Sequence, residues 1–124
     1  MKKVRTEKAP AAVGPYSQAI ISGNFVFASG QLGLNDDGIL EGDVATQTEN
    51  AIKHLSEVLA AAGSSLDDVV KTTCFLSNIK DFAAFNQTYG KYFTSKPARS
   101  LIEAAALPKG SLVEIEAIAE IHKA

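Results

Sequence analysis

Two glutamates and one arginine near the C-terminus have the types and spacing for acid–base or anion-binding chemistry. Glu114 and Glu116 are two residues apart in an apolar run, so in a strand they share the face opposite Val113 and Ile115. Arg99 is the nearest cation outside the intervening loop. Its guanidinium could form a structural ion pair with a glutamate, or grip a ligand carboxylate through two parallel hydrogen bonds. Spacing alone favours the ion pair.

Other catalytic chemistry finds little support in the sequence. There is no Gly-x-Ser-x-Gly elbow, no Gly-x-x-x-x-Gly-Lys-Ser/Thr loop and no Gly-x-Gly-x-x-Gly turn. Cys74 alternates within an apolar strand and is expected to be a buried, unreactive thiol. We expect His54 to be solvated with Gln47 on the polar side of a helix, and His122 to be solvated at the C-terminus.

Two helices are predicted. Apolar positions recur at helical spacing over residues 44–62, where Asp43 offers an N-cap and Gly63 a stop. A second helix is expected over residues 81–93, with Asn78 or Asp81 near its start. Its expected buried stripe consists of aromatic residues: Phe82, Phe85, Tyr89 and Tyr92 or Phe93.

The remaining apolar runs read as strands. After a proline- and glycine-rich loop at 10–17, the expected strands are residues 19–21 and 25–28, which form a hairpin, then 69–76, 99–105 and 112–121. The order ββαβαββ predicts an α+β fold, with a mixed sheet and two helices on one of its faces.

The strands are apolar on both faces, which two helices on one side cannot cover. In residues 69–76, Val70 and Leu76 are expected on one face with Thr72 and Cys74, while Val69 and Phe75 lie on the other. Because large exposed apolar patches mark interaction surfaces, we expect identical subunits to bury the second face.

Length and composition restrict the class of protein. The 124 residues, 46% hydrophobic and 21% charged, predict one globular domain over residues 1–124. A net charge of −2 argues against nucleic acid as a general partner. One cysteine and two histidines cannot form an internal disulfide or a familiar structural zinc site. No apolar run suits a signal peptide or a membrane span, so we expect a cytoplasmic protein.

Several separated motifs occur together in one order. They are AAVGPYSQ at 11–18, SGQ at 29–31, DFAAFN at 81–86, PARS at 97–100, LPKG at 107–110 and VEIEAIA at 113–119. In this combination the chain closely resembles the Rid (YjgF, L-PSP) family of reactive-imine deaminases over almost its whole length. The resemblance implies a chorismate-mutase-like fold and a homotrimer whose sheets form a central barrel, with clefts between subunits.

The resemblance also implies an activity. Members hydrolyse 2-imino acids such as 2-iminobutanoate and 2-iminopropanoate to 2-oxo acids and ammonia, without a cofactor or metal. By position, Arg99 matches the carboxylate-binding arginine, Glu114 the glutamate that positions or activates water, and Tyr16 the cleft tyrosine. Three further residues match the lining of the same cleft: Ser29, Gly30 and Asn86.

The chain departs from the family pattern at two places. Leu101 stands where many relatives carry cysteine or threonine, and the loop at 94–96 is shorter than usual. Both are expected to border the cleft, and Leu101 there would contact substrate and influence which substrates fit. Two other hypotheses stay open: a non-catalytic regulator that binds 2-oxo acids, and an endoribonuclease or translation inhibitor, which the acidic charge balance opposes.

Overall fold

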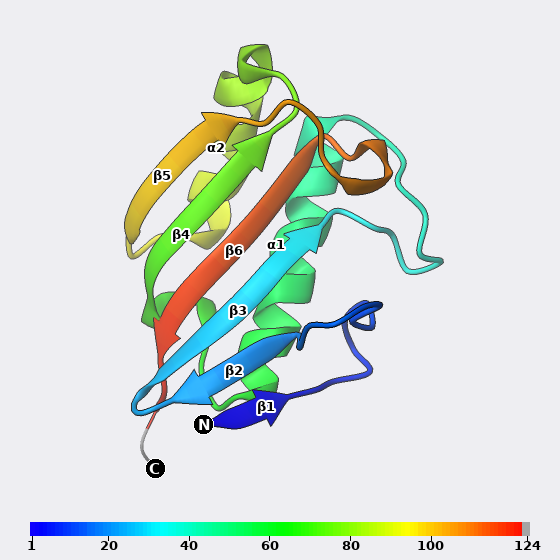
Figure 1. Cartoon of the computed structure of the whole chain (residues 1–124). Coiled ribbons are helices and arrows are strands. Elements are labelled where there is room, and N and C mark those ends of the chain that lie inside the picture. Colours follow the sequence, from blue (N-terminus) through cyan, green and yellow to red (C-terminus); the bar gives the residue numbers. More distant parts are fainter. Residues whose placement is uncertain (123–124) are drawn as a thin grey trace.

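A computed structural model describes residues 1–122 and shows a six-stranded sheet with two helices on one face (Figure 1). The helices are α1 (Val44–Ala61) and α2 (Phe82–Tyr92), and neither is long and apolar enough to cross a membrane. The sheet order is β1-β2-β3-β6-β4-β5, from strands β1 (Lys2–Val4), β2 (Ala19–Ser22), β3 (Phe25–Leu32), β4 (Val69–Leu76), β5 (Ala98–Glu103) and β6 (Val113–Glu120).

The predicted α+β order is confirmed, with one strand added. Only β4 and β5 pair in parallel, so the sheet is mixed. The added strand β1 pairs with β2 at the sheet edge, where Val4 is buried and Lys2 and Lys3 are exposed. Its single buried residue gives no alternating pattern, and lysines are common on edge strands.

The helix boundaries follow the signals in the sequence. The Asp43 carboxylate accepts a hydrogen bond from the Thr46 amide at 3.0 Å, and Gly63 ends α1 with a φ of 81°. A 3₁₀ turn, η2 (Ile79–Asp81), precedes α2, and Asn78 caps that turn by accepting from the Lys80 amide. The start of the second helix is therefore one residue later than predicted.

The buried stripe of α2 is only partly as predicted. Phe85, Tyr89 and Phe93 are buried and Tyr92 is half-buried. Phe82 is 41% exposed, so its predicted burial is wrong. Phe82 belongs to the first turn of α2 and lies beside Arg99 on the edge strand β5, away from the core.

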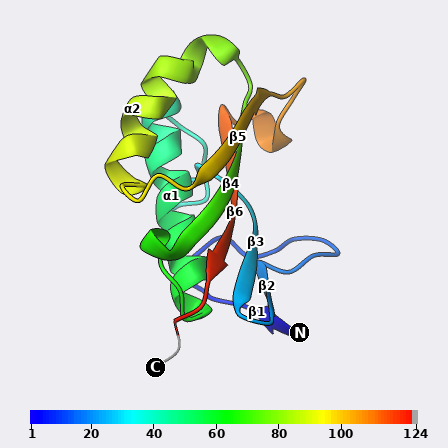
Figure 2. The ribbon, with the colours of Figure 1, turned by 90° about the vertical axis from the view of Figure 1, so that its left-hand side faces the viewer.

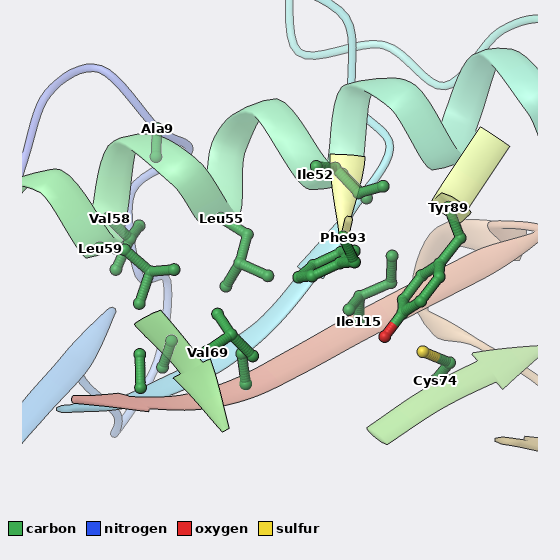
Figure 3. Packing of buried hydrophobic residues seen from close by; sticks show 14 of the residues in the cluster. Ala9, Ile52, Leu55, Val58, Leu59, Val69, Cys74, Tyr89, Phe93 and Ile115 are labelled. Carbon is green, nitrogen blue, oxygen red and sulfur yellow. The ribbon is translucent and has the colours of Figure 1, made fainter. Parts of the chain in front are cut away.

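The core lies between α1 and the sheet. Leu55, Val58 and Leu59 of α1 face Val69 and Ile115 of the sheet in Figure 3, and all five residues are buried. Close approach of helix and strand requires Gly33, where a Cβ would lie 2.5 Å from the Cα of Gln47. The apolar positions predicted over residues 44–62 therefore form the face of the helix that packs against the sheet.

A β-bulge reverses part of the predicted alternation in β4. Val69 pairs with Ala119 and Lys71 with Ile118, so Val70 is an extra residue. As a result Val69 is 4% exposed and Val70 is 37% exposed, the reverse of the expected faces. Beyond the bulge, the alternation is regular again up to Leu76.

The sheet face opposite the helices is open and partly apolar. Figure 2 shows both helices on one side of the sheet. Exposed apolar side chains on the other side come from three strands: Phe25 and Phe27 of β3, Val70 of β4 and Ile102 of β5. The predicted second apolar face is present, and its burial in a homotrimer remains a prediction.

Candidate functional site

Four of the predicted site residues meet in one hollow on the open side of the sheet. Tyr16, Ser29, Gly30 and Glu114 line a hollow of about 540 Å³, which is called the Glu114 hollow below. These residues come from the loop before β2, from β3 and from the start of β6. The fold thus brings together side chains that are nearly one hundred positions apart in the chain.

Glycine at position 30 leaves room for the Glu114 carboxylate in the position that it occupies. A Cβ on Gly30 would lie 2.8 Å from the Cδ of Glu114 and closer still to its Oε2. The pairing of β3 with β6 also shifts register between Ala28 and Gln31, so a bulge lies at this point. The strand over residues 25–28 was predicted to end here; instead it bulges, carrying Gly30 against the glutamate, and continues to Leu32.

Two hydrogen bonds from Ser29 hold the segment that follows Tyr16 at the rim of this hollow. The Ser29 hydroxyl donates to the Ser17 carbonyl at 2.6 Å, and the Ser29 amide donates to the Gln18 carbonyl at 2.9 Å. Tyr16 directly precedes this segment and is 52% exposed. The Ser29 hydroxyl thus donates its hydrogen to the loop and keeps its oxygen as an acceptor, so ligand contact by Ser29 stays a prediction.

Gln18 holds the loop before β2, a role that the sequence did not predict. Its buried amide accepts a hydrogen bond from the Thr6 amide at 2.7 Å and donates to the Pro10 carbonyl at 2.8 Å. These bonds hold the loop that leads to Tyr16, because buried backbone groups need partners. In the sequence, Gln18 is only a glutamine directly before an apolar strand, and this pattern does not indicate that its side chain holds a loop.

The surroundings of Glu114 make it a stronger base than an exposed glutamate. Its side chain is half-buried on the open face, as the β6 alternation predicts, while Glu116 on the same face is exposed. Burial raises the pKa of the Glu114 carboxyl above its usual value, and the nearby Glu116 carboxylate raises it further. A carboxylate with a raised pKa accepts a proton from water more readily.

Gln47 fixes the start of the strand that carries Glu114. Its Oε1 accepts from the Leu112 amide at 3.0 Å, and its Nε2 donates to the Gly42 carbonyl at 3.3 Å. Gln47 is buried, so its predicted place on a solvated face is wrong. The reason is that α1 packs its N-terminal half against both β3 and the chain entering β6.

The two histidines make local contacts. His54 is half-buried, and its Nε2 lies 2.7 Å from the Leu34 carbonyl, so its expected full solvation is wrong. His122 is mostly exposed, as predicted, and pairs with the Asp68 carboxylate at 2.6 Å. Neither residue lines the Glu114 hollow.

Arg99 lies on the other face of the sheet. It pairs in register with buried Thr72 and projects toward α2, where its Nη1 donates to Asn86 Oδ1 at 2.8 Å. Its Cζ is 4.9 Å from the Tyr89 ring centroid and 5.9 Å from the Phe85 centroid. Such an aromatic surrounding stabilises a guanidinium while leaving other N–H groups available.

Arg99 forms no ion pair with either glutamate. In the part of the chain that the structure describes, Lys53 pairs with Glu49 at 3.2 Å, and the other ion pair is that of His122. Arg99 and Asn86 line a second hollow, the Arg99 hollow, together with Thr94 and Lys96. The short loop at 94–96 thus borders the ligand-sized space beside Arg99.

Leu101 lines neither hollow. It lies on β5 opposite Cys74 of β4 and is half-buried against the core. The predicted burial of Cys74 is confirmed, and burial raises the pKa of its thiol to about 11, which favours the protonated, unreactive form. Substrate contact by Leu101 therefore stays a prediction.

One chain therefore presents two separate candidate half-sites. Glu114 with Tyr16 lies on the open face, Arg99 with Asn86 lies on the helix face, and β4 separates β5 from β6. Within residues 1–122, no group of three or more His, Cys, Asp or Glu side chains could hold a metal ion.

Comparisons with known proteins identify relatives of this chain. Residues 6–121 match the family described as Endoribonuclease L-PSP. The human protein named 2-iminobutanoate/2-iminopropanoate deaminase is 45% identical over 119 residues, covering 94% of this chain and 87% of its own. AldR of Lactococcus lactis, named as a candidate regulator, is 50% identical and covers 98% of both chains.

A solved structure shows the same fold with a small molecule bound. The crystal structure of Escherichia coli TdcF with bound serine superposes with a TM-score of 0.93 at 36% identity, covering 98% of this chain and all of TdcF. The matched family spans both half-sites, from the loop that carries Tyr16 to the strand that carries Glu114. As its motifs predict, the chain belongs to the Rid (YjgF, L-PSP) family.

Proposed function

We propose that this protein is a 2-iminobutanoate/2-iminopropanoate deaminase, which hydrolyses reactive imino acids to 2-oxo acids and ammonia. The observation that carries the proposal is the Glu114 carboxylate, half-buried with a raised pKa over the glycine that makes room for it. The human relative bears the name of this activity at 45% identity. The reaction class is hydrolysis of a C=N bond.

We propose that two subunits build each site. Arg99 and Glu114 lie on opposite faces of one chain, so they can contact one small substrate only if neighbouring copies contribute one each. The apolar open face supports assembly, since such patches are buried in oligomers. A homotrimer with three equivalent clefts satisfies both requirements.

Substrate binding uses the carboxylate that all 2-imino acids share. The Arg99 guanidinium has N–H groups beyond the one that bonds Asn86, and these can hold the substrate carboxylate. This contact directs the C=N carbon toward the neighbouring subunit's half-site. Tyr16 and Gly30 would then border the reacting end of the molecule.

Glu114 would move the proton in both halves of the reaction. A water held by its carboxylate adds to the protonated imine carbon; the water oxygen forms the new C–O bond and Glu114 accepts the proton. The product is a tetrahedral carbinolamine. Glu114 then returns the proton to the amino nitrogen and the C–N bond breaks, with its electron pair leaving on ammonia. The regenerated Glu114 carboxylate takes the carbinol O–H proton as the ketone forms and passes it to ammonia, which leaves as ammonium. No bond to the protein is required.

The required acceleration is modest. General acid–base help of this kind contributes about 10² to 10⁴-fold, and imines already hydrolyse quickly in water. Water is the nucleophile, which agrees with the neutral, buried state of Cys74.

The test couples the purified protein to a threonine dehydratase and follows 2-oxobutanoate. We expect the protein to accelerate its formation, Glu114→Gln to lose most of that acceleration, and Arg99→Ala to raise KM strongly. Glu120→Gln is the matched control, because Glu120 shares the strand face of Glu114, is exposed and is not among the groups that raise the Glu114 pKa. A wild-type protein that adds nothing to the uncatalysed rate refutes the proposal.

A regulator is the second candidate, favoured by the name of AldR at 50% identity. Such a protein would use the same half-sites to bind 2-oxo acids without turning anything over. Calorimetric titration with 2-oxobutanoate separates the two functions: saturable binding in a protein with no deaminase activity supports the regulator.

A further inference from the structure

A hydrogen-bonded pair of hydroxyls lies in the apolar core beneath Arg99. Thr72 of β4 is fully buried, Tyr89 of α2 is nearly so, and their oxygens are 2.7 Å apart. In Figure 3 the Tyr89 hydroxyl points toward the strand that carries Cys74. Burial raises the pKa of the Tyr89 phenol, so the group remains a neutral hydroxyl at ordinary pH.

This pair adds little stability that an apolar pair would not supply. Replacing both partners of a buried hydrogen bond by apolar groups of similar shape can be nearly neutral, and Val with Phe would fill the same space. What the bond does provide is a fixed orientation for the Tyr89 ring. The ring also stacks on Phe93, with centroids 4.4 Å apart and an interplanar angle of 24°.

The fixed ring is in contact with the Arg99 guanidinium. The Cζ of Arg99 is 4.9 Å from the Tyr89 centroid, closer than to either phenylalanine nearby. On α2, Asn86 lies three residues before Tyr89 and accepts one Arg99 N–H at 2.8 Å. A ring contact and a hydrogen bond from one helix together define the plane of the guanidinium.

We propose that Tyr89, held by Thr72, is a positioning residue that orients Arg99 for the substrate carboxylate. The inference rests on the proposed function in taking Arg99 as the carboxylate-binding group. A bidentate contact needs the guanidinium and the carboxylate to be coplanar. A guanidinium whose plane is free to rotate therefore binds the substrate carboxylate more weakly. The effect belongs to binding of the carboxylate, away from the reacting carbon, so it changes KM rather than kcat.

Thr72→Val and Tyr89→Phe test the anchor while they keep the aromatic ring. We expect each to raise KM for the imino acid, and Kd for 2-oxobutanoate, by about three- to tenfold, with kcat within about twofold. Tyr89→Leu removes the ring as well and should raise both constants further. Tyr92→Phe is the matched control, a tyrosine of the same helix that does not touch Arg99, and should change neither constant.

The double variant T72V/Y89F separates positioning from stability. Thr72→Val leaves the Tyr89 hydroxyl without its partner, and Tyr89→Phe leaves the Thr72 hydroxyl only the 3.8 Å contact from the Cys74 thiol. Each single variant should lower the melting temperature, while the double variant removes both hydroxyls and should recover it. If the pair positions Arg99, KM stays raised in the recovered protein. If the pair is only structural, KM returns to the wild-type value together with the melting temperature, and the proposal is overturned.

A double-mutant cycle with Arg99→Lys shows whether Tyr89 acts through Arg99. In the Arg99→Lys background, Tyr89→Phe should change KM and Kd by less than about twofold, because lysine has no planar guanidinium for Tyr89 to orient. Equal effects in both backgrounds overturn the proposal. Failure of the deaminase proposal is distinguishable, since it would show as a wild-type protein without turnover while the Kd for 2-oxobutanoate still reports on Tyr89.

Discussion

The raised pKa of Glu114 makes its carboxylate a stronger base and also lowers the stability of the folded protein at neutral pH. Because burial and Glu116 raise its pKa in the folded protein, the folded state binds the proton more tightly than the unfolded state does. The stabilising contribution is therefore complete below the unfolded pKa and is lost as pH rises through the folded pKa. At neutral pH the ionised carboxylate lowers the free energy of unfolding.

The first prediction follows from this sign. The free energy of unfolding of Glu114→Gln, relative to that of wild type, should increase as pH rises from about 4, where an ordinary glutamate titrates, toward 7. Urea unfolding at a series of pH values measures the difference, and Glu120→Gln, at an exposed carboxylate on the same face of β6, is the control. In wild type, kcat/KM should fall on acidification with an inflection above that range. A constant difference in stability between Glu114→Gln and wild type contradicts the assignment.

Gly30 yields a second residue-scale prediction. Its backbone φ does not lie in the left-handed region, so alanine is compatible with the backbone, but its Cβ would displace the Glu114 carboxylate. Displacing a catalytic group by about 1 Å can cost on the order of 10²-fold. Gly30→Ala should therefore lower kcat by that order while remaining folded. In the Glu114→Gln background the same change should have little further effect, which coupled assays of the four proteins can establish.

At the scale of elements, periodic segments were predictable and aperiodic ones were not. The apolar stripe of α1, with its Asp43 cap, and the alternation of β6 each repeat one signal several times, so the expectations from sequence hold. The bulges at Val70 and near Gly30 each depend on one extra residue whose effect is set by the partner strand. Local spacing in the sequence likewise does not predict the strand order that separates Arg99 from Glu114.

Gln47 provides the element-scale prediction. Replacing its amide by the apolar side chain of Gln47→Leu leaves the Leu112 amide and the Gly42 carbonyl without their partner. The Leu112 amide is half-buried and an unsatisfied buried group costs about 1–3 kcal/mol, whereas the Gly42 carbonyl belongs to an exposed residue and can bond water instead. The variant should be destabilised by about 1–3 kcal/mol, with faster hydrogen exchange at Leu112. Asn50→Ala, which loses only a 3.4 Å bond to the Gly33 carbonyl, is the control and should have a smaller effect.

At the scale of the whole molecule, the open sheet face should control both assembly and activity. Phe27 is 45% exposed on that face and contributes nothing to the core under the helices. Phe27→Asp should therefore leave the subunit folded but convert a trimer to monomers in light scattering, with loss of deaminase activity. Ile39→Asp, an exposed apolar residue in the loop before α1, is the control. Full activity in a monomeric Phe27→Asp protein would contradict a shared site.

The separation of Arg99 from Glu114 permits a stricter test of sharing. Arg99→Ala keeps the Glu114 half-site, and Glu114→Gln keeps the Arg99 half-site, so a cleft between one copy of each can contain both wild-type groups. In a closed ring of three, every mixed trimer has one such cleft, and random mixing gives about one quarter of wild-type activity. Unfolding the two inactive proteins together and refolding them should restore that fraction. If one chain supplied the whole site, the mixture would stay as inactive as its components.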